Sequence, residues 1–257
     1  MNSLDQFNLS GRVAIVTGGS RGIGRAVSEL LTEMGALVVV NYASNAEAAL
    51  KLVQDLKEKG RESVAVQADV SIVSQAHQLV EETLKQFGRL DILVCSAGVW
   101  EGSPVDAMSE QTWDRTIDIN LKGTWAVCQA AIRVMKSQNA GRVVVISSTA
   151  GQRGEAGYSN YGASKAGQIG FVKSLADEVG RWGITVNAVA PGWVDTEMTA
   201  EALGDESRRK AIAQSIPLRA IAIPSDIAGP VAFLCTDWAR HITGEVLNVN
   251  GGSVLCG

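Results

Sequence analysis

The amino-terminal strand, turn and helix constrain the fold of this chain more than any other segment. A short β-branched run, Val13–Thr17, leads into the turn Gly18-x-x-x-Gly22-x-Gly24, and residues 25–34 then have helical periodicity. Such a unit binds dinucleotides, because the glycines let the backbone approach a pyrophosphate at the amino end of the helix. The spacing differs from the commoner Gly-x-Gly-x-x-Gly pattern, and an ordinary strand-to-helix turn is the alternative interpretation.

The alternation of apolar strands and amphipathic helices continues along the chain. We expect further strands at 37–41, 63–67, 90–94, 142–147, 184–189 and 245–249, helices at 46–59, 71–87, 112–137 and from Tyr161 onward, and a loosely helical polar segment at 197–215. Strands that alternate with helices predict a doubly wound α/β fold, with a seven-stranded parallel sheet covered on both faces. Because the 257 residues contain no Pro- or Ser-rich linker, we expect a single domain over 1–257.

Composition excludes several classes of function. With a formal charge of -4, the chain lacks the basic surface of a nucleic-acid-binding protein, and its apolar runs are too short to span a membrane. Residues 1–7 lack the basic and apolar regions of a signal peptide, so a soluble cytoplasmic protein is expected. The four cysteines (Cys95, Cys128, Cys235 and Cys256) form no Cys-x-x-Cys pair. We therefore expect small buried apolar groups rather than a metal site.

Polar residues around the fifth strand form the candidate catalytic site. Tyr161 and Lys165 lie four residues apart, so on a helix the ammonium sits below the phenol and favours its ionised form. Ser148 ends a strand and is expected to point into the ligand crevice of a parallel sheet. Asn120 interrupts an apolar helical stripe, where it would hold a water or break the helix locally. The alternative is a buried tyrosine followed by a surface lysine.

The end of the second strand indicates which dinucleotide is bound. An acidic residue roughly twenty positions after the glycine turn binds the ribose 2′-hydroxyl of NAD. Here that position is Asn41, and no carboxylate follows until Glu47. Arg21, Ser44 and Asn45 could instead bind a 2′-phosphate, the last two from the amino end of a helix. We therefore expect NADP(H) to be favoured over NAD(H), although Arg21 could simply be a solvated loop residue.

The order and spacing of these motifs resemble the short-chain dehydrogenase/reductase superfamily in its single-domain form over nearly the whole chain. The resemblance implies a Rossmann-like sheet and hydride transfer between a nicotinamide and an alcohol or ketone. The matching motifs, in chain order, are Thr17-Gly18-x-x-x-Gly22-x-Gly24, Asp69-Val70, Ala97-Gly98, Asn120, Ser148, Tyr161-x-x-x-Lys165 and Pro191-Gly192.

The resemblance also implies a role for each catalytic residue. Tyr161 would donate or accept the proton, and Lys165 would lower its pKa while binding the nicotinamide ribose. Ser148 would hold the substrate oxygen, and Asn120 would anchor a water that links Lys165 to solvent.

Most of the expected cofactor contacts come from the ends of strands and from the glycine turn. Asp69 would bind the adenine amino group or, equally, cap the next helix. The full expected set is Gly18, Ser20, Arg21, Gly22, Ile23, Gly24, Asn41, Tyr42, Ser44, Asn45, Asp69, Val70, Ala97, Gly98, Tyr161, Lys165, Pro191, Gly192, Val194 and Thr196.

Within the superfamily, the chain is most similar to 3-oxoacyl-[acyl-carrier-protein] reductases and related NADPH-dependent ketoreductases. Two departures weaken the expectation that the substrate is bound to a carrier protein. Cys95-Ser96-Ala97-Gly98 replaces the usual Asn-Asn-Ala-Gly, and Asp177 stands where a basic residue is usual, although Arg133 and Lys136 keep positive charge nearby. Because this positive charge could still bind an acidic carrier, acyl carrier protein stays a candidate partner.

The resemblance suggests a homodimer or homotetramer formed through the tyrosine helix. Gly162, Ala166 and Gly170 recur every four residues and give this helix a flat side. Packing against the protein's own sheet would explain these small residues equally well.

Four residues that follow strand ends are candidates for the substrate pocket: Trp100, Gln152, Arg153 and Trp193. The alternative is that the aromatic pair packs in the core or a lid. We expect reduction of a ketone, a 3-oxoacyl thioester or another carbonyl compound, to a secondary alcohol. The alternatives are an alcohol, sugar or hydroxysteroid dehydrogenase working oxidatively, or a nucleotide-binding sensor without turnover.

Overall fold

The sheet has seven parallel strands in the order β3-β2-β1-β4-β5-β6-β7. The structure is a computed structural model that describes residues 7–255, so the expectations for Cys256 and for residues 1–6 lie outside it. The predicted α/β class with a seven-stranded parallel sheet is confirmed. The strands are β1 (Val13–Thr17), β2 (Leu37–Tyr42), β3 (Ser63–Gln67), β4 (Ile92–Cys95), β5 (Gly141–Ile146), β6 (Ile184–Pro191) and β7 (Val246–Val249).

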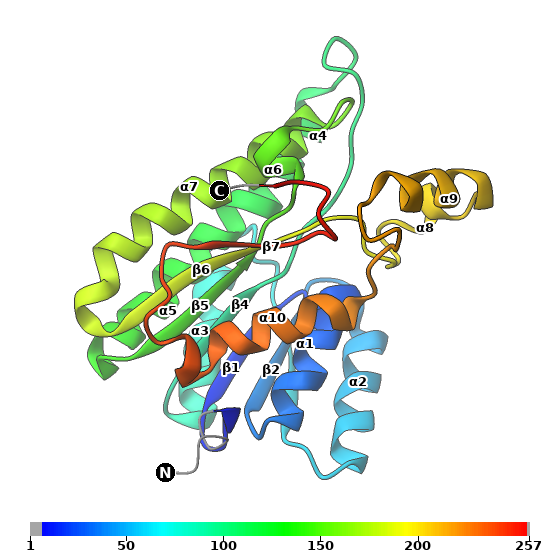
Figure 1. Ribbon diagram of the computed structural model, residues 1–257. Coiled ribbons are helices and arrows are strands. Elements are labelled where there is room, and N and C mark those ends of the chain that lie inside the picture. The colour runs from blue at the N-terminus through cyan, green and yellow to red at the C-terminus, as the bar shows by residue number, and fades with distance from the viewer. Residues whose placement is uncertain (1–6, 256–257) are drawn as a thin grey trace.

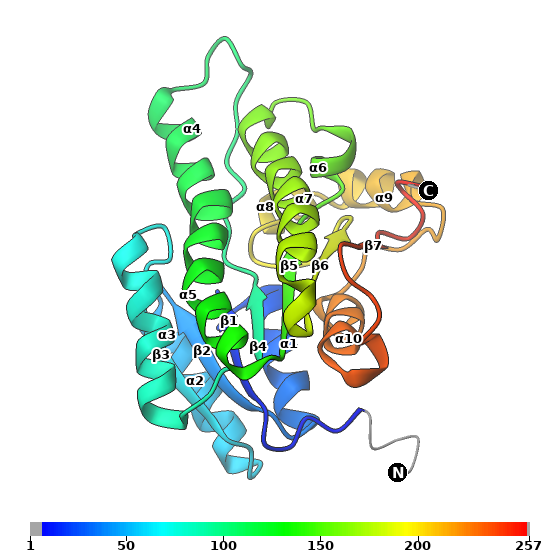
Figure 2. The same ribbon diagram turned by 90° about the vertical axis from the view of Figure 1, so that its left-hand side faces the viewer.

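Helices cover both faces of the sheet (Figures 1 and 2). Side chains alternate along each strand, so Val143 and Val145 of β5 join one apolar cluster while Val144 and Ile146 join the other. The first cluster lies under α3 (Val73–Phe87), α5 (Gly123–Gln138) and α7 (Ser159–Val179), and the second under α1 (Gly22–Glu33), α2 (Ala46–Glu58) and α10 (Pro224–Cys235).

The helix predicted at 112–137 is divided into three parts. α4 (Glu110–Ile117) leads into a π-helical turn, Asp118–Lys122, and α5 then begins at Gly123. Asn120 lies in the middle of the π turn and is fully buried. The helix does not break at Asn120 but widens locally into the π turn and continues as α5. A π turn inserts one extra residue, which re-aims the side chains that follow.

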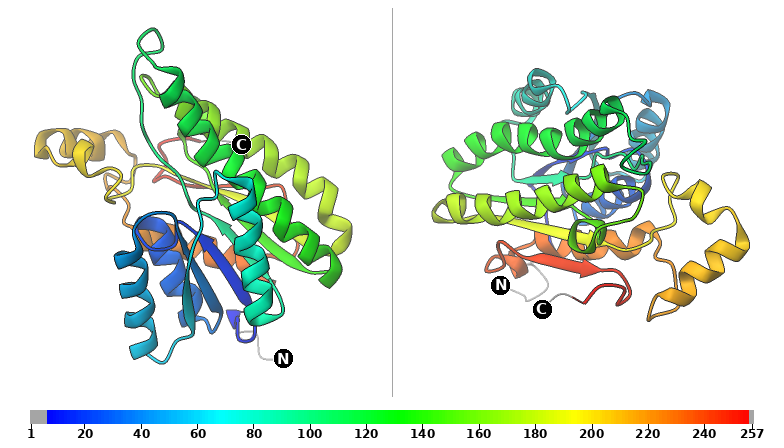
Figure 3. Two further views of the ribbon diagram at one scale, coloured as in Figure 1. Left: turned by 180° about the vertical axis from the view of Figure 1, so that it is seen from behind. Right: turned by 90° about the horizontal axis from the view of Figure 1, so that it is seen from above.

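Two regions differ from the expected pattern. The segment expected at 197–215 contains α8 (Ala200–Leu203) and α9 (Glu206–Ser215), which project from the body of the protein (Figures 1 and 3). The sequence analysis did not assign α10, because Gly229 and Pro230 interrupt its helical pattern. Among residues 7–255, no helix is long and apolar enough to cross a membrane.

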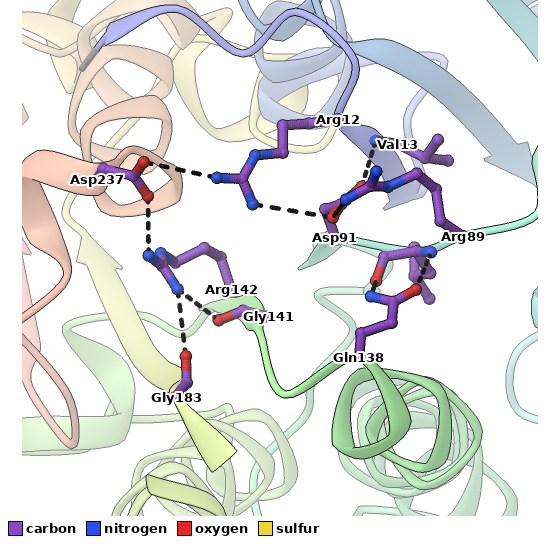
Figure 4. A network of polar contacts seen from close by, with 10 residues as sticks. Arg12, Val13, Arg89, Asp91, Gln138, Gly141, Arg142, Gly183 and Asp237 are labelled. Carbon is purple, nitrogen blue, oxygen red and sulfur yellow. Dashed lines mark hydrogen bonds and ion pairs between the residues drawn. The ribbon is translucent and has the colours of Figure 1, made fainter. Parts of the chain in front are cut away.

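A polar network fixes the amino ends of β1, β4 and β5 (Figure 4). The motifs lie at the opposite, carboxyl ends of the strands. Buried Asp91 accepts hydrogen bonds from the Val13 backbone at 2.9 Å and from two nitrogens of Arg89 at 2.8 and 2.7 Å. Asp237 pairs with Arg12 and with Arg142, which is almost fully buried. The network ties the start of the sheet to the segment that follows α10.

Candidate active site

A cavity of about 700 Å³ lies at the carboxyl ends of the strands. Every residue expected to bind the cofactor lines this cavity, from Gly18 in the first turn to Thr196 after β6. Ser148 lines it too. A parallel sheet binds ligands at this edge, where the loops after the strands converge. The residues expected to bind the cofactor therefore meet at a single site with Ser148.

The glycine turn leaves no room for a side chain at Gly18 or Gly24. A Cβ atom at Gly24 would lie 2.2 Å from the Gly18 carbonyl oxygen, and one at Gly18 would lie 2.9 Å from the Cα atom of Ala97. Thr17 fixes the neighbouring loop, because its hydroxyl accepts hydrogen bonds from the Ser96 and Ala97 backbone at 3.0 and 3.1 Å. The backbone is thus held close to the cavity at the amino end of α1, which suits the pyrophosphate of a dinucleotide.

The residues expected to select the nucleotide line the same cavity. Asn41 is buried, and its carboxamide binds the backbone at Gly18 and Ala68, so it supports the cavity wall. Asn45 caps α2 by accepting a hydrogen bond from Ala48 at 3.0 Å. Arg21 is exposed at the cavity and forms no ion pair with any described residue.

Asp69 lines the same part of the cavity. One of its carboxylate oxygens accepts hydrogen bonds from the Ser71 backbone and hydroxyl at 3.0 and 2.7 Å. These contacts organise the turn before α3, but the N-cap of that helix is Ile72 and no side chain caps it, so the alternative that Asp69 caps the helix is wrong. The Asp69 side chain borders the cavity.

Of the four expected catalytic residues, Ser148, Tyr161 and Lys165 line the cavity, whereas Asn120 does not. The Nζ atom of Lys165 lies 5.6 Å from the centroid of the Tyr161 ring, one helical turn away along α7. It donates a hydrogen bond to the Ile146 carbonyl oxygen at 2.7 Å, at the end of β5. Ser148 follows the same strand and hydrogen-bonds with Tyr161. Strand β5 and helix α7 together position all three groups.

Burial dominates the protonation of this pair. It raises the pKa of Tyr161 to about 12, and the hydrogen bond from Ser148 opposes this increase only in part. Burial also lowers the pKa of Lys165 to about 7. The expected lowering of the tyrosine pKa by the lysine is therefore not found, because desolvation disfavours the charged form of both groups. Tyr161 carries its proton at neutral pH.

Asn120 joins the loop after β4 to the catalytic helix. Its carboxamide pairs with both the N–H and the carbonyl group of Val99, at 2.8 and 3.0 Å, and donates to the Ser164 hydroxyl at 3.1 Å. Its backbone carbonyl oxygen accepts from Thr124 and Gln168, both at 2.7 Å. These contacts show that Asn120 links the two segments through protein groups, and the water expected beside it stays a prediction.

Of the four candidate substrate residues, only Trp100 lines the cavity. Gln152 lies in the short helix α6 (Ala150–Arg153), and its amide donates to Asn248 at 2.7 Å instead. Arg153 is exposed at the end of that helix. Trp193 contacts the Trp100 ring edge to face, with centroids 5.7 Å apart. Trp193 therefore supports the Trp100 ring and does not line the cavity itself.

The sequence analysis missed two residues beside Trp100. Tyr158 stacks on the Trp100 ring with centroids 4.6 Å apart, and Glu155 accepts a hydrogen bond from its indole nitrogen at 3.3 Å. Tyr158 precedes Tyr161 by three residues, which is a signal that could have identified it. No sequence pattern marks Glu155, because its contact with Trp100 joins residues 55 positions apart.

Comparison with known proteins agrees with this site. Residues 18–253 match the family described as enoyl-(acyl carrier protein) reductase. The chain is 45% identical over 242 residues, 94% of this chain and 98% of the relative, to the 3-oxoacyl-[acyl-carrier-protein] reductase FabG of Staphylococcus aureus. It is 42% identical over 248 residues, 96% of this chain and 98% of the relative, to the 3-oxoacyl-[acyl-carrier-protein] reductase of a Synechocystis strain.

A solved structure has the same fold. The structure titled "Crystal structure of gox2181" superposes with a TM-score of 0.94 at 35% sequence identity, covering 97% of this chain and 98% of that one. Fold and site thus define a Rossmann-like oxidoreductase that uses a nicotinamide cofactor. The chain belongs to the matched family, within the short-chain dehydrogenase/reductase superfamily.

Proposed function

We propose that this protein reduces a ketone to a secondary alcohol with NADPH, and that a 3-oxoacyl thioester is the first substrate to test. The observation that carries the proposal is that Ser148, Tyr161 and Lys165 line the same cavity as the glycine turn. Relatives at 40–45% identity bear the name 3-oxoacyl-[acyl-carrier-protein] reductase, and the substrate in that name is a ketone.

The chemistry follows from the protonation of the three side chains. When bound, a reduced nicotinamide supplies the hydride. Tyr161 holds its proton at neutral pH and donates it to the carbonyl oxygen as negative charge grows there. Ser148 donates a hydrogen bond to the same oxygen and stabilises that charge. Lys165, with a pKa of about 7, can hold or release a proton below Tyr161 at the pH of the reaction.

The preference for NADPH rests on the residues at the adenosine end. Asn41 is neutral, so it does not repel a 2′-phosphate as a carboxylate at that position would. The exposed guanidinium of Arg21 borders the cavity and forms no ion pair with any described residue. Ser44 and Asn45 precede α2, so the backbone N–H groups of its first turn add to the positive end. These groups form a site for a dianion.

Acyl carrier protein and a second copy of the chain are proposed partners. The relatives' names support the carrier, whereas exposed Asp177 and the ion pair of Lys136 with Glu178 reduce the positive charge at that place. On α7, Gly162 is buried, but Gly170 has open space around it and Ala166 is exposed. These two small residues leave a flat outer surface on which another copy could pack.

Cofactor consumption tests the proposal directly. We expect rapid oxidation of NADPH, and slow oxidation of NADH, when a 3-oxoacyl thioester is added to the protein. Product analysis should find the 3-hydroxyacyl thioester. If the protein binds NADPH but turns over no ketone, a sensor function would replace the proposed one.

A further inference from the structure

Three aromatic side chains form a cluster at the substrate end of the cavity: Trp100, Tyr158 and Trp193. The rings of Trp100 and Tyr158 are nearly parallel, at 11° with centroids 4.6 Å apart. Trp193 meets Trp100 at 89° with centroids 5.7 Å apart. Both are favoured arrangements of aromatic pairs. Because Trp100 alone of the three lines the cavity, the other two support its ring from behind and from the side.

A hydrogen bond fixes the rotation of the Trp100 ring. Its indole nitrogen donates to a carboxylate oxygen of Glu155 at 3.3 Å, across the boundary between the loop after β4 and the turn before α7. Glu155 is half-buried, and it forms no ion pair with any of residues 7–255. The carboxylate is therefore available to hold the indole.

The backbone around Trp100 is held as firmly as its ring. A Cβ atom at Gly102 would lie 2.4 Å from both the Gly157 carbonyl oxygen and the Tyr158 ring, so the two loops touch. Buried Asn160 donates a hydrogen bond to the Glu101 carbonyl oxygen at 3.0 Å. These contacts flank Trp100 on its carboxyl side, and the loop cannot move away from α7 without breaking them.

The Trp100 ring gives the cavity a flat aromatic surface. Tyr161 follows Tyr158 by one helical turn, and the negative charge of Glu155 is near enough to raise the pKa of the Tyr161 phenol. Glu155 therefore opposes an anionic group on a substrate at this place, and the positive charge of Arg153, which acts on the same carboxylate, offsets part of that repulsion. A planar uncharged group can stack on an aromatic ring that is already positioned, without the entropy cost of ordering it.

We propose that Trp100 is the specificity-determining residue of the cavity, with Glu155 as its positioning residue, and that it favours uncharged ketones whose carbonyl carries a planar ring. The inference rests on the proposed ketone reduction and specifies which ketones react best. Linear 3-oxoacyl chains contact the same ring only along an edge or a face without stacking, so they gain less from it.

The test compares two thioesters that differ only beyond the ketone: 3-oxo-3-phenylpropanoyl and 3-oxohexanoyl N-acetylcysteamine. For Trp100→Ala we expect kcat/KM to fall about tenfold on the phenyl ketone and less than about threefold on the linear one. Trp100→Phe, which keeps a ring, should lie between the wild type and Trp100→Ala. Trp113→Ala is the matched control, because Trp113 is exposed on α4 and lies outside the cavity lining.

Two variants of Glu155 separate its hydrogen bond from its charge. Glu155→Gln keeps an acceptor for the indole, whereas Glu155→Leu removes it, and both remove the charge. We expect Glu155→Leu to raise KM for the phenyl ketone about threefold with little change in kcat, and Glu155→Gln to restore the wild-type KM. A merely structural role would not produce this rescue.

Two results would overturn the inference. Equal losses on both thioesters in Trp100→Ala and Glu155→Leu would mean that Trp100 does not discriminate between ketones, while the ketoreductase function stands. If wild-type protein that binds NADPH reduces neither thioester, the proposed function fails and the inference fails with it. The wild-type measurement distinguishes the two cases.

Discussion

The ammonium nitrogen of Lys165 lies 5.6 Å from the centroid of the Tyr161 ring and is bound to the Ile146 carbonyl oxygen. Burial of both groups lowers the pKa of the lysine to about 7 and raises that of the tyrosine to about 12. The phenol is thus protonated at neutral pH, as the proposed role of proton donor requires, and the lysine is close to half-protonated there. A protonated phenol suits the reduction of a ketone, because the carbonyl oxygen needs a proton in that reaction.

The Lys165 pKa makes stability depend on pH. Between about 7, its pKa in the folded protein, and 10.5, its ordinary value, the unfolded chain binds a proton that the folded chain does not. We therefore expect the free energy of unfolding of the wild type, relative to Lys165→Met, to rise between about pH 7 and about pH 9. Tyr161 adds nothing in this window, because its raised pKa matters only above 10. Urea unfolding at the two pH values checks the sign, and a pH-independent difference would contradict it.

Arg21 provides a test of nucleotide preference. We expect Arg21→Ala to weaken NADPH binding by about tenfold or more, because a guanidinium bond to a phosphate is lost, and to leave NADH binding nearly unchanged. Arg25→Ala is the control, since Arg25 pairs with Glu29 and Asp55 away from the main cavity. Titration of each variant with both nucleotides gives the answer, and equal weakening of the two would refute a 2′-phosphate contact.

Asp91 should stabilise the fold without affecting the site. Its carboxylate is buried and accepts from the Val13 backbone and twice from Arg89 (Figure 4). Asp91→Ala leaves those donors unpaired, so we expect the free energy of unfolding to fall by about 3 kcal/mol. Exposed Asp177→Ala should change it by less than about 0.5 kcal/mol. Denaturation curves for the two variants make the comparison, and similar values would show that the network contributes little.

The sequence predicted the sheet because each strand is a short apolar run next to a turn signal, and β1 and β3 have the predicted bounds. It also predicted the residues of the cavity wall, because the ends of parallel strands meet at one edge. The helix predicted at 112–137 is present as one helical run over 110–138, but its π turn was not predictable, since Val99 and Ser164, the tertiary partners of Asn120, decide where the helix widens.

The substrate end was the least predictable part. Gln152 was expected in the pocket, yet its amide binds Asn248 on β7. Glu155 and Tyr158 reach Trp100 only because the loop after β4 folds against the start of α7. Such contacts join loops that are distant in sequence, so they cannot be predicted from the periodicity of the sequence. The pKa values of Tyr161 and Lys165 were not predictable either, because burial in the folded protein sets both.

Replacement of the proton donor tests the central claim most directly. We expect Tyr161→Phe to lose NADPH-linked reduction of a 3-oxoacyl thioester by at least about a hundredfold, because the ring remains but the phenol proton is absent. NADPH should still bind with nearly the wild-type Kd. Binding without turnover would support Tyr161 as the donor in a ketone reduction, whereas a reduction rate equal to that of the wild type would contradict the mechanism.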